Sequence, residues 1–174
     1  MKKLIALVLV LVMAVSMAAC GEKAAEKAPL AGTMDENAAK IMEIAPVEFM
    51  AGPMPVDLTD TSEDGKWALS YFTGLQDAAS ITDVAVYEPM MGSQAFSLVL
   101  VRTAEGSDPQ AVAQEMKDNI DPRKWICVGA DEIMAAGYGD TVMFIMLDSQ
   151  MGLSAQSYVD AFAEVCGADL DFTI

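Results

Sequence analysis

The chain has 174 residues, of which 53% are apolar and none is histidine, and its formal net charge at pH 7 is −16. It is too apolar for a disordered acidic tail and too acidic for a nucleic-acid binder, because phosphate contacts need clustered Lys and Arg. Without histidine the chain can hold no Ser-His-Asp or Cys-His relay, no imidazole base and no zinc site of the His-containing kinds. The length suits one domain.

Residues 1–19 have the layout of a secretory signal peptide, because two lysines precede an uncharged apolar run and small residues follow it. The apolar run is shorter than the roughly 20 residues that a transmembrane helix needs, so a permanent membrane helix is the less favoured alternative. The segment MAACG at residues 17–21 resembles the lipobox of bacterial lipoproteins, with Met17 where leucine is commonest. The resemblance implies that the thiol of Cys20 is alkylated with diacylglycerol, a lipid anchor with acyl chains such as palmitate, and that Cys20 becomes the first residue after cleavage.

Lipidation at Cys20 would hold the protein on the extracytoplasmic face of the cell membrane, since two or more acyl chains anchor a protein firmly. Removal of the signal peptide leaves 8 Lys and Arg against 26 Asp and Glu, which is a formal charge of −18. Anionic headgroups repel such a body, so we expect it to stand off the membrane. Residues 20–32 are low in complexity and predict a flexible tether, and residues 33–174 predict one extracytoplasmic domain.

The domain is predicted to begin with two helices. Thr33 forms a capping-box pattern with Glu36, and apolar residues at helical spacing continue the first helix to Pro46. A loop rich in proline and methionine separates it from a shorter helix over residues 65–72, which Gly74 ends. We expect this second helix to bury its three aromatic side chains, those of Trp67, Tyr71 and Phe72.

The centre of the chain predicts a hairpin of two strands, over residues 84–88 and 95–103, because both runs are rich in β-branched and aromatic residues. Asp108 is then placed as an N-cap and Pro109 at the first position of a helix. Pro122 closes that helix. The hairpin and the helix after it therefore form one strand-strand-helix unit.

The last part of the chain predicts a second hairpin, with strands over residues 133–138 and 141–147. Ser154 is expected to cap a helix that Gly167 ends, and the polar-apolar alternation of residues 169–174 favours a short edge strand. Hairpins imply an antiparallel sheet of about four strands, with a short fifth strand at the C-terminus. We expect helices on one face of it, which is an α+β two-layer sandwich.

Four short segments resemble the sequence pattern of a known family: YFTG at 71–74, VYEPMM at 86–91, LVLV at 98–101 and GY at 137–138. Residues 33–166 together resemble bacterial lipoproteins of the family called domain of unknown function 4358. The chain departs from that pattern where the family usually has a longer charged helix, since it breaks at Pro122 and inserts WICV. The resemblance implies this location and fold and carries no known reaction.

Residues 60–65 carry the first half of an EF-hand calcium loop, with oxygen side chains at the first, third and fifth positions and glycine at the sixth. The twelfth position is Tyr71 rather than the bidentate glutamate that the loop needs. The favoured interpretation is a helix start, with Thr61 or Ser62 as the N-cap and acidic residues at the positive end of the helix dipole. We expect no metal site.

Cys127 and Cys166 are the only thiols besides Cys20. Outside the membrane a disulfide between them could close a loop of 39 residues and stabilise the fold by about 4 kcal/mol. The alternative is two reduced cysteines in the core, for which Cys166 on the apolar stripe of the last helix is suited.

Met90 and Met91 lie in a predicted loop, as do Met50 and Met54. Thioethers in loops can pack, line an adaptable binding surface or bind copper(I), and the spacing is not regular enough for a copper site. Met90 and Met91 are therefore the candidate surface for an envelope protein or peptide.

No catalytic motif is present. Glycosidase chemistry needs only two carboxylates, but the candidates fall in predicted loops or element ends: Asp57, Asp60, Asp131, Glu132, Asp169 and Asp171. Ser-x-x-Lys pairs on a helix and glycine loops for phosphate are absent. We expect a binding or accessory module of the cell envelope, with no cofactor and no nucleic acid as partner. The alternative is an envelope hydrolase that uses its carboxylates.

Overall fold

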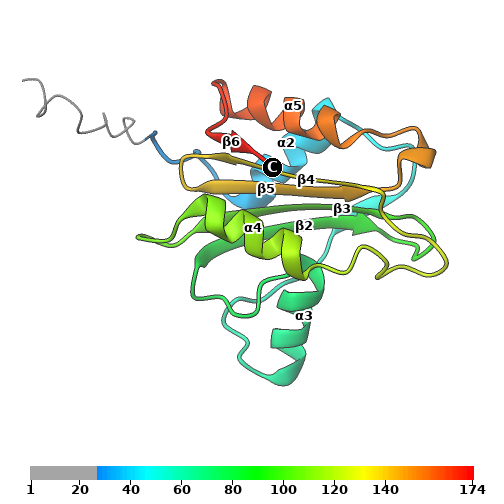
Figure 1. Ribbon diagram of the computed structural model, residues 1–174, viewed down its shortest axis with the longest axis horizontal. Helices are drawn as coiled ribbons and strands as arrows, with labels where there is room; N and C mark the ends of the chain where they lie inside the picture. Colours follow the sequence, from blue (N-terminus) through cyan, green and yellow to red (C-terminus); the bar gives the residue numbers. More distant parts are fainter. Residues whose placement is uncertain (1–26) are drawn as a thin grey trace, which may run out of the picture.

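A six-stranded antiparallel sheet forms the middle layer of the computed structural model, which describes residues 27–174 (Figure 1). The strands lie in the order β1-β2-β3-β5-β4-β6. The elements are α2 (Met34–Ile44), β1 (Ala51–Pro53), α3 (Glu63–Thr73), β2 (Ile81–Pro89), β3 (Phe96–Thr103), α4 (Pro109–Asn119), β4 (Glu132–Tyr138), β5 (Thr141–Leu147), the 3-10 turn η1 (Ser149–Met151), α5 (Ala155–Cys166) and β6 (Phe172–Thr173). The predicted signal peptide and Cys20 lie outside the described residues. No helix within residues 27–174 is long and apolar enough to cross a bilayer.

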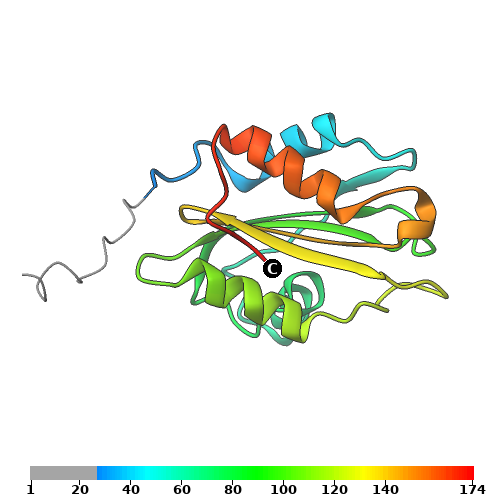
Figure 2. The same cartoon turned by 45° about the horizontal axis from the view of Figure 1, so that its top comes forward.

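Helices cover both faces of the sheet, so the predicted two-layer sandwich is wrong and the domain has three layers. α2 and α5 pack on one face, and α4 and α3 lie on the other (Figures 1 and 2). The central strands β3 and β5 are buried along almost their whole length. A strand with one solvated face alternates apolar and polar residues, whereas a strand covered on both sides is apolar throughout. The uninterrupted apolar runs in these two strands are the sequence signal of the third layer.

The sheet has more strands than predicted. Both predicted hairpins are confirmed, and the C-terminal strand is confirmed as two residues, 172–173, that pair with β4. β1 was not predicted, because its three residues include Gly52 and Pro53, which favour turns rather than strands. It pairs with the end of β2 and forms one edge of the sheet.

The predicted helix caps are confirmed at three of the four helices. Thr33 and Glu36 form the capping box of α2, Ser62 caps α3, and Asp108 caps α4. The exception is α5, where the Ser154 side chain makes no cap hydrogen bond. The first N–H of α5, that of Ala155, instead donates to the carboxylate of Glu132 on β4.

Trp67 is exposed rather than buried, which corrects the prediction for α3. The buried positions of this helix are Gly65, Leu69 and Thr73, which follow one another every four residues. Trp67 lies two positions from that row and so faces the opposite side, where 62% of its surface is exposed. Its ring stacks on Tyr71 with the ring centroids 4.7 Å apart.

The folded structure begins before Thr33, so the end of the predicted tether at residues 20–32 belongs to the domain. We call residues 27–32 the entry segment. Leu30 is 8% exposed and packs in the core between α2 and the sheet. Arg102 Nη2 on β3 donates hydrogen bonds to the carbonyl oxygens of Leu30 and Gly32, both at 2.8 Å. One apolar anchor and one arginine therefore fix this segment to the sheet.

Candidate functional site

Large exposed apolar side chains gather at one end of the sheet. We define the methionine patch as Met50, Met90, Met91 and Ile126, whose exposed fractions are 76%, 60%, 67% and 72%. Met90 and Met91 were the predicted binding surface, Met50 was predicted to lie in a loop, and Ile126 was not predicted. Contiguous apolar surface of this kind is typical of interaction sites.

Two backbone contacts bring the patch together from three distant parts of the chain. Met90 N, at the end of β2, donates to the carbonyl oxygen of Met50 at 2.9 Å. Ile126 N, in the loop between α4 and β4, donates to the carbonyl oxygen of Gly92 in the β2–β3 hairpin at 2.7 Å. A Cβ atom at Gly92 would lie 3.6 Å from Ile126 Cδ1, so the isoleucine packs directly over this glycine.

A buried ion pair lies under the loop that carries Ile126. Lys124 Nζ is 2.5 Å from Glu88 Oε1, and the two side chains are 1% and 7% exposed. The rings of Tyr71, Phe72 and Trp125 surround the ammonium group, with centroids 4.8, 5.4 and 5.5 Å from Nζ. Burial lowers the pKa of Lys124, and the adjacent carboxylate opposes that shift. Apart from this ion pair, Glu88 Oε1 has no hydrogen-bond partner among residues 27–174.

Reciprocal hydrogen bonds join the same loop to α3. Lys124 Nζ donates to the carbonyl oxygen of Tyr71 at 3.1 Å, and Tyr71 Oη donates to the carbonyl oxygen of Lys124 at 3.3 Å. Burial, reinforced by the negative charges of Glu88 and Asp121, raises the pKa of Tyr71. The loop is therefore held on β2 by an ion pair and on α3 by two hydrogen bonds, and its position determines where Ile126 lies.

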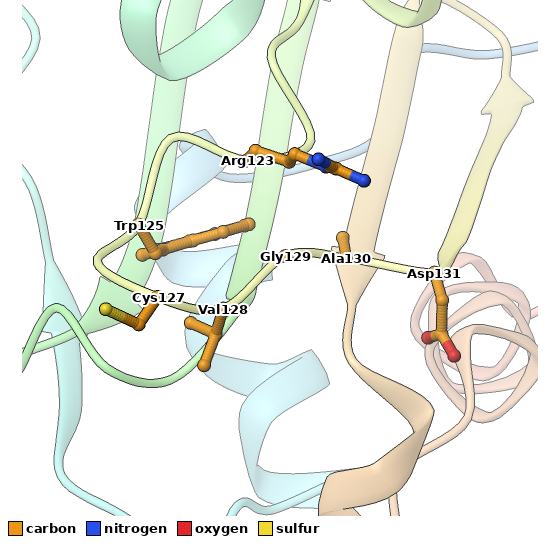
Figure 3. Close-up of a pocket in the computed structure, with 7 residues that line it drawn as sticks. All are labelled: Arg123, Trp125, Cys127, Val128, Gly129, Ala130 and Asp131. Carbon is orange, nitrogen blue, oxygen red and sulfur yellow. The ribbon is translucent and has the colours of Figure 1, made fainter.

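A shallow hollow of about 550 Å³ opens in this loop, lined by Arg123, Trp125, Cys127, Val128, Gly129, Ala130 and Asp131 (Figure 3). Figure 3 shows Arg123 and Asp131 at separate places on the rim. The Asp131 carboxylate accepts hydrogen bonds from Ser149 N and Oγ, both at 2.7 Å, and these bonds lower its pKa. The hollow offers one exposed cation and one engaged carboxylate, which is not a general acid-base pair.

The calcium-like segment forms a helix start, as predicted. Asp60 Oδ1 accepts from Ser62 N at 2.9 Å, and Ser62 Oγ accepts from Gly65 N at 3.2 Å. The hydrogen bonds from Ser62 lower the pKa of Asp60. In the part of the chain that the structure describes, no group of three or more Cys, Asp or Glu side chains could hold a metal ion.

The two cysteines are free, so the possible disulfide between them is not formed. Cys166 packs against the core on the α5 face, whereas Cys127 follows Trp125, which packs on the α4 face. A disulfide needs Cα atoms within about 7 Å, which residues on opposite faces of a sheet do not reach. The alternative of two thiols in the core fits Cys166, which is half-buried, and is wrong for Cys127, which is exposed. Burial raises the pKa of Cys166 to about 12.

The carboxylates considered for catalysis mostly stabilise turns and helix starts. Glu132 Oε2 accepts from Ala155 N at 2.7 Å and so caps α5 from the neighbouring strand. Asp171 accepts from Gly139 N at 2.7 Å in the β4–β5 turn. Asp57, Asp60 and Asp131 accept from backbone N–H groups in the same way. A structural role is therefore visible for five of the six.

Two residues of the site were not predicted from the sequence. Lys124 and Ile126 lie in the WICV region, and their roles depend on contacts with α3 and the β2–β3 hairpin. The segments YFTG and VYEPMM, which carry the family resemblance, supply Tyr71, Phe72 and Glu88 around the lysine. Lys124 directly follows Arg123 in the sequence, so no local signal separated the buried cation from the exposed one.

Fold and site together define an α+β domain with an exposed apolar patch at one end of its sheet. Scans of protein-family models, curated proteins and solved structures found no match to the chain. The resemblance to domain of unknown function 4358 therefore stays a prediction.

Proposed function

We propose that the chain is a lipid-anchored extracytoplasmic lipoprotein and that it binds a protein or peptide of the cell envelope through the methionine patch. The observation that carries the proposal is the patch itself, where four large apolar side chains are each at least 60% exposed. Burial of such side chains in a complex removes apolar surface from water, which drives association.

The construction of the site supports a binding role. Met side chains are flexible and polarizable, so they adapt to the surface of a partner. The backbone beneath them is fixed by the Lys124–Glu88 ion pair and by the strand pairing of β1 with β2. A backbone that is already fixed reduces the ordering cost of binding.

The proposed anchor is tested by Cys20→Ala in the native host. We expect this variant to be released from the membrane or to retain its signal peptide, because the lipobox cysteine is the lipid acceptor. An unchanged membrane fraction and an unchanged protein mass would overturn the lipoprotein assignment.

The binding role is tested by placing a photo-crosslinking amino acid at position 91 in the anchored protein and irradiating intact cells. We expect a discrete adduct from position 91 and none from Gln110, an exposed position on α4. Ile126→Ser in the same protein should weaken the adduct, because the patch loses one of its four side chains. Absence of an adduct at position 91 would overturn the proposed function.

A further inference from the structure

We propose that the partner of the methionine patch is a cationic amphipathic segment, which lays its apolar face on the patch and its Lys or Arg side chains on an acidic rim. This inference rests on the proposed function and adds the chemistry of the partner. It follows from the charges around the patch and from the position of the patch relative to the entry segment.

Three acidic residues lie at the same end of the sheet as the patch. Glu48 is exposed and lies two residues before Met50. Asp148 N donates to the carbonyl oxygen of Ala95 at 2.9 Å, which places this residue at the β2–β3 hairpin. Asp131 is exposed, and hydrogen bonds from the neighbouring serine lower its pKa, so it is ionised at neutral pH.

The cations of the domain do not offset this rim. Residues 27–174 contain 7 Lys and Arg against 24 Asp and Glu, and four of the seven are in ion pairs. At the patch end, Lys124 is buried in its pair and Arg123 is exposed. The described domain is therefore strongly negative overall, and complementary charge favours a positive partner.

The patch lies far from the point where the chain enters the domain. β3 begins at the hairpin and ends where Arg102 holds the entry segment and Thr103 N donates to the carbonyl oxygen of Asp140. A strand of this length spans about 26 Å. The entry segment therefore lies at one end of the sheet and the patch at the other. Because the proposed anchor precedes the entry segment in the chain, this arrangement favours a protein segment over the bilayer as the occupant.

The test uses the whole mature polypeptide with Cys20→Ala, made without lipid, so that no membrane competes for the probe. Three synthetic peptides serve as probes. The first forms an amphipathic helix with Leu on one face and Lys on the other, the second is a scrambled peptide of the same composition, and the third has Glu in place of Lys. Fluorescence anisotropy of the labelled peptides measures binding at low and high salt. We expect the Leu/Lys peptide to bind about tenfold more tightly than the scrambled one. Its affinity should fall as the salt concentration rises and should be higher than that of the Glu peptide.

Matched variants locate the binding. Met90→Ser with Met91→Ser should weaken binding about tenfold, whereas Ile44→Ser, which alters an exposed apolar residue of α2, should leave it unchanged. Glu48→Gln should weaken binding by a few-fold, unlike Glu105→Gln on the turn after β3 at the other end of the sheet. Circular dichroism checks that each variant is folded.

Other occupants give different results. Equal binding of the Glu peptide, patch-dependent binding to phosphatidylcholine vesicles, or self-association lost in the Met90→Ser, Met91→Ser variant would each overturn the cationic partner. An adduct at position 91 with a neutral or acidic segment would also overturn it and would leave the proposed function standing. Loss of every adduct at position 91 refutes the proposed function instead.

Discussion

The ion pair between Lys124 and Glu88 allows a direct test of how the patch is held in place. Both side chains are almost fully shielded, at 1% and 7% exposure, so removal of one partner leaves an uncompensated charge in the interior. Such a loss costs about 3–5 kcal/mol, whereas apolar replacement of both partners is often neutral. Lys124→Met and Glu88→Leu should each lower the free energy of unfolding by about 3–5 kcal/mol, and the double variant by less than about 1 kcal/mol.

Urea unfolding followed by tryptophan fluorescence measures these differences, and the single variants should also lose roughly 10 °C in melting temperature. The control is Lys66→Met, which breaks an exposed pair with Glu63 whose side chains are 57% and 95% exposed. An exposed pair contributes little, so this variant should differ from the parent by less than about 1 kcal/mol. The reasoning is refuted if either buried single variant matches the parent, or if the double variant is as unstable as the two losses added together.

Other contacts lead to three more expectations. An alkylating reagent at about pH 8 should modify exposed Cys127 well before Cys166, because burial raises the pKa of Cys166 to about 12. Peptide mass mapping at successive times measures the two rates. Arg102→Ala removes the hydrogen bonds to the entry segment and should speed tryptic cleavage after Lys27, measured by mass spectrometry. Glu132→Ala removes the cap of α5 and should lower the free energy of unfolding by about 1 kcal/mol in urea.

Each of these expectations has a matched comparison. Cys127→Ser should abolish the fast alkylation phase, and equal labelling rates for the two thiols would contradict the burial of Cys166. Arg123→Ala, an exposed arginine in the α4–β4 loop, should leave tryptic cleavage after Lys27 unchanged. Glu164→Ala, an exposed carboxylate later in α5, should leave stability unchanged, so a similar loss from both variants would argue against the cap.

The titration of Cys166 also makes the stability of the folded protein depend on pH. Its pKa in the folded chain is about 12, above the ordinary value of 9.0, so the folded state keeps the thiol proton longer than the unfolded state does. The resulting stabilisation is complete below the ordinary value and is lost as the pH rises toward the folded value. Removal of the thiol by Cys166→Ala should flatten the alkaline decline of stability.

Local sequence signals predicted the helices and hairpins well, because caps and turns depend on residues close together in the chain. The capping box of Thr33 and the left-handed Gly74 at the end of α3 are examples. The third layer was not predicted, because the strands were recognised by their residue types alone. The continuous apolar runs at 98–101 in β3 and 142–147 in β5 indicate strands that are covered on both faces.

The site was only partly predictable, because it is assembled from segments far apart in the sequence. Loop placement was enough to select Met90 and Met91 as exposed. Ile126 and Lys124 depend on the contacts of the α4–β4 loop with the hairpin and with α3, at separations of tens of residues. Nothing in the local pattern distinguishes a buried, ring-surrounded lysine from a solvated one.

The shortness of the two edge strands has a consequence for a protein crowded on a surface. β1 has three residues and ends in Pro53, and β6 has two residues. Long unpaired edges invite strand addition between neighbouring molecules, and short or proline-bearing edges prevent it. Copies concentrated in two dimensions by the proposed anchor would thus find no long template in β1 or β6 for intermolecular strand addition.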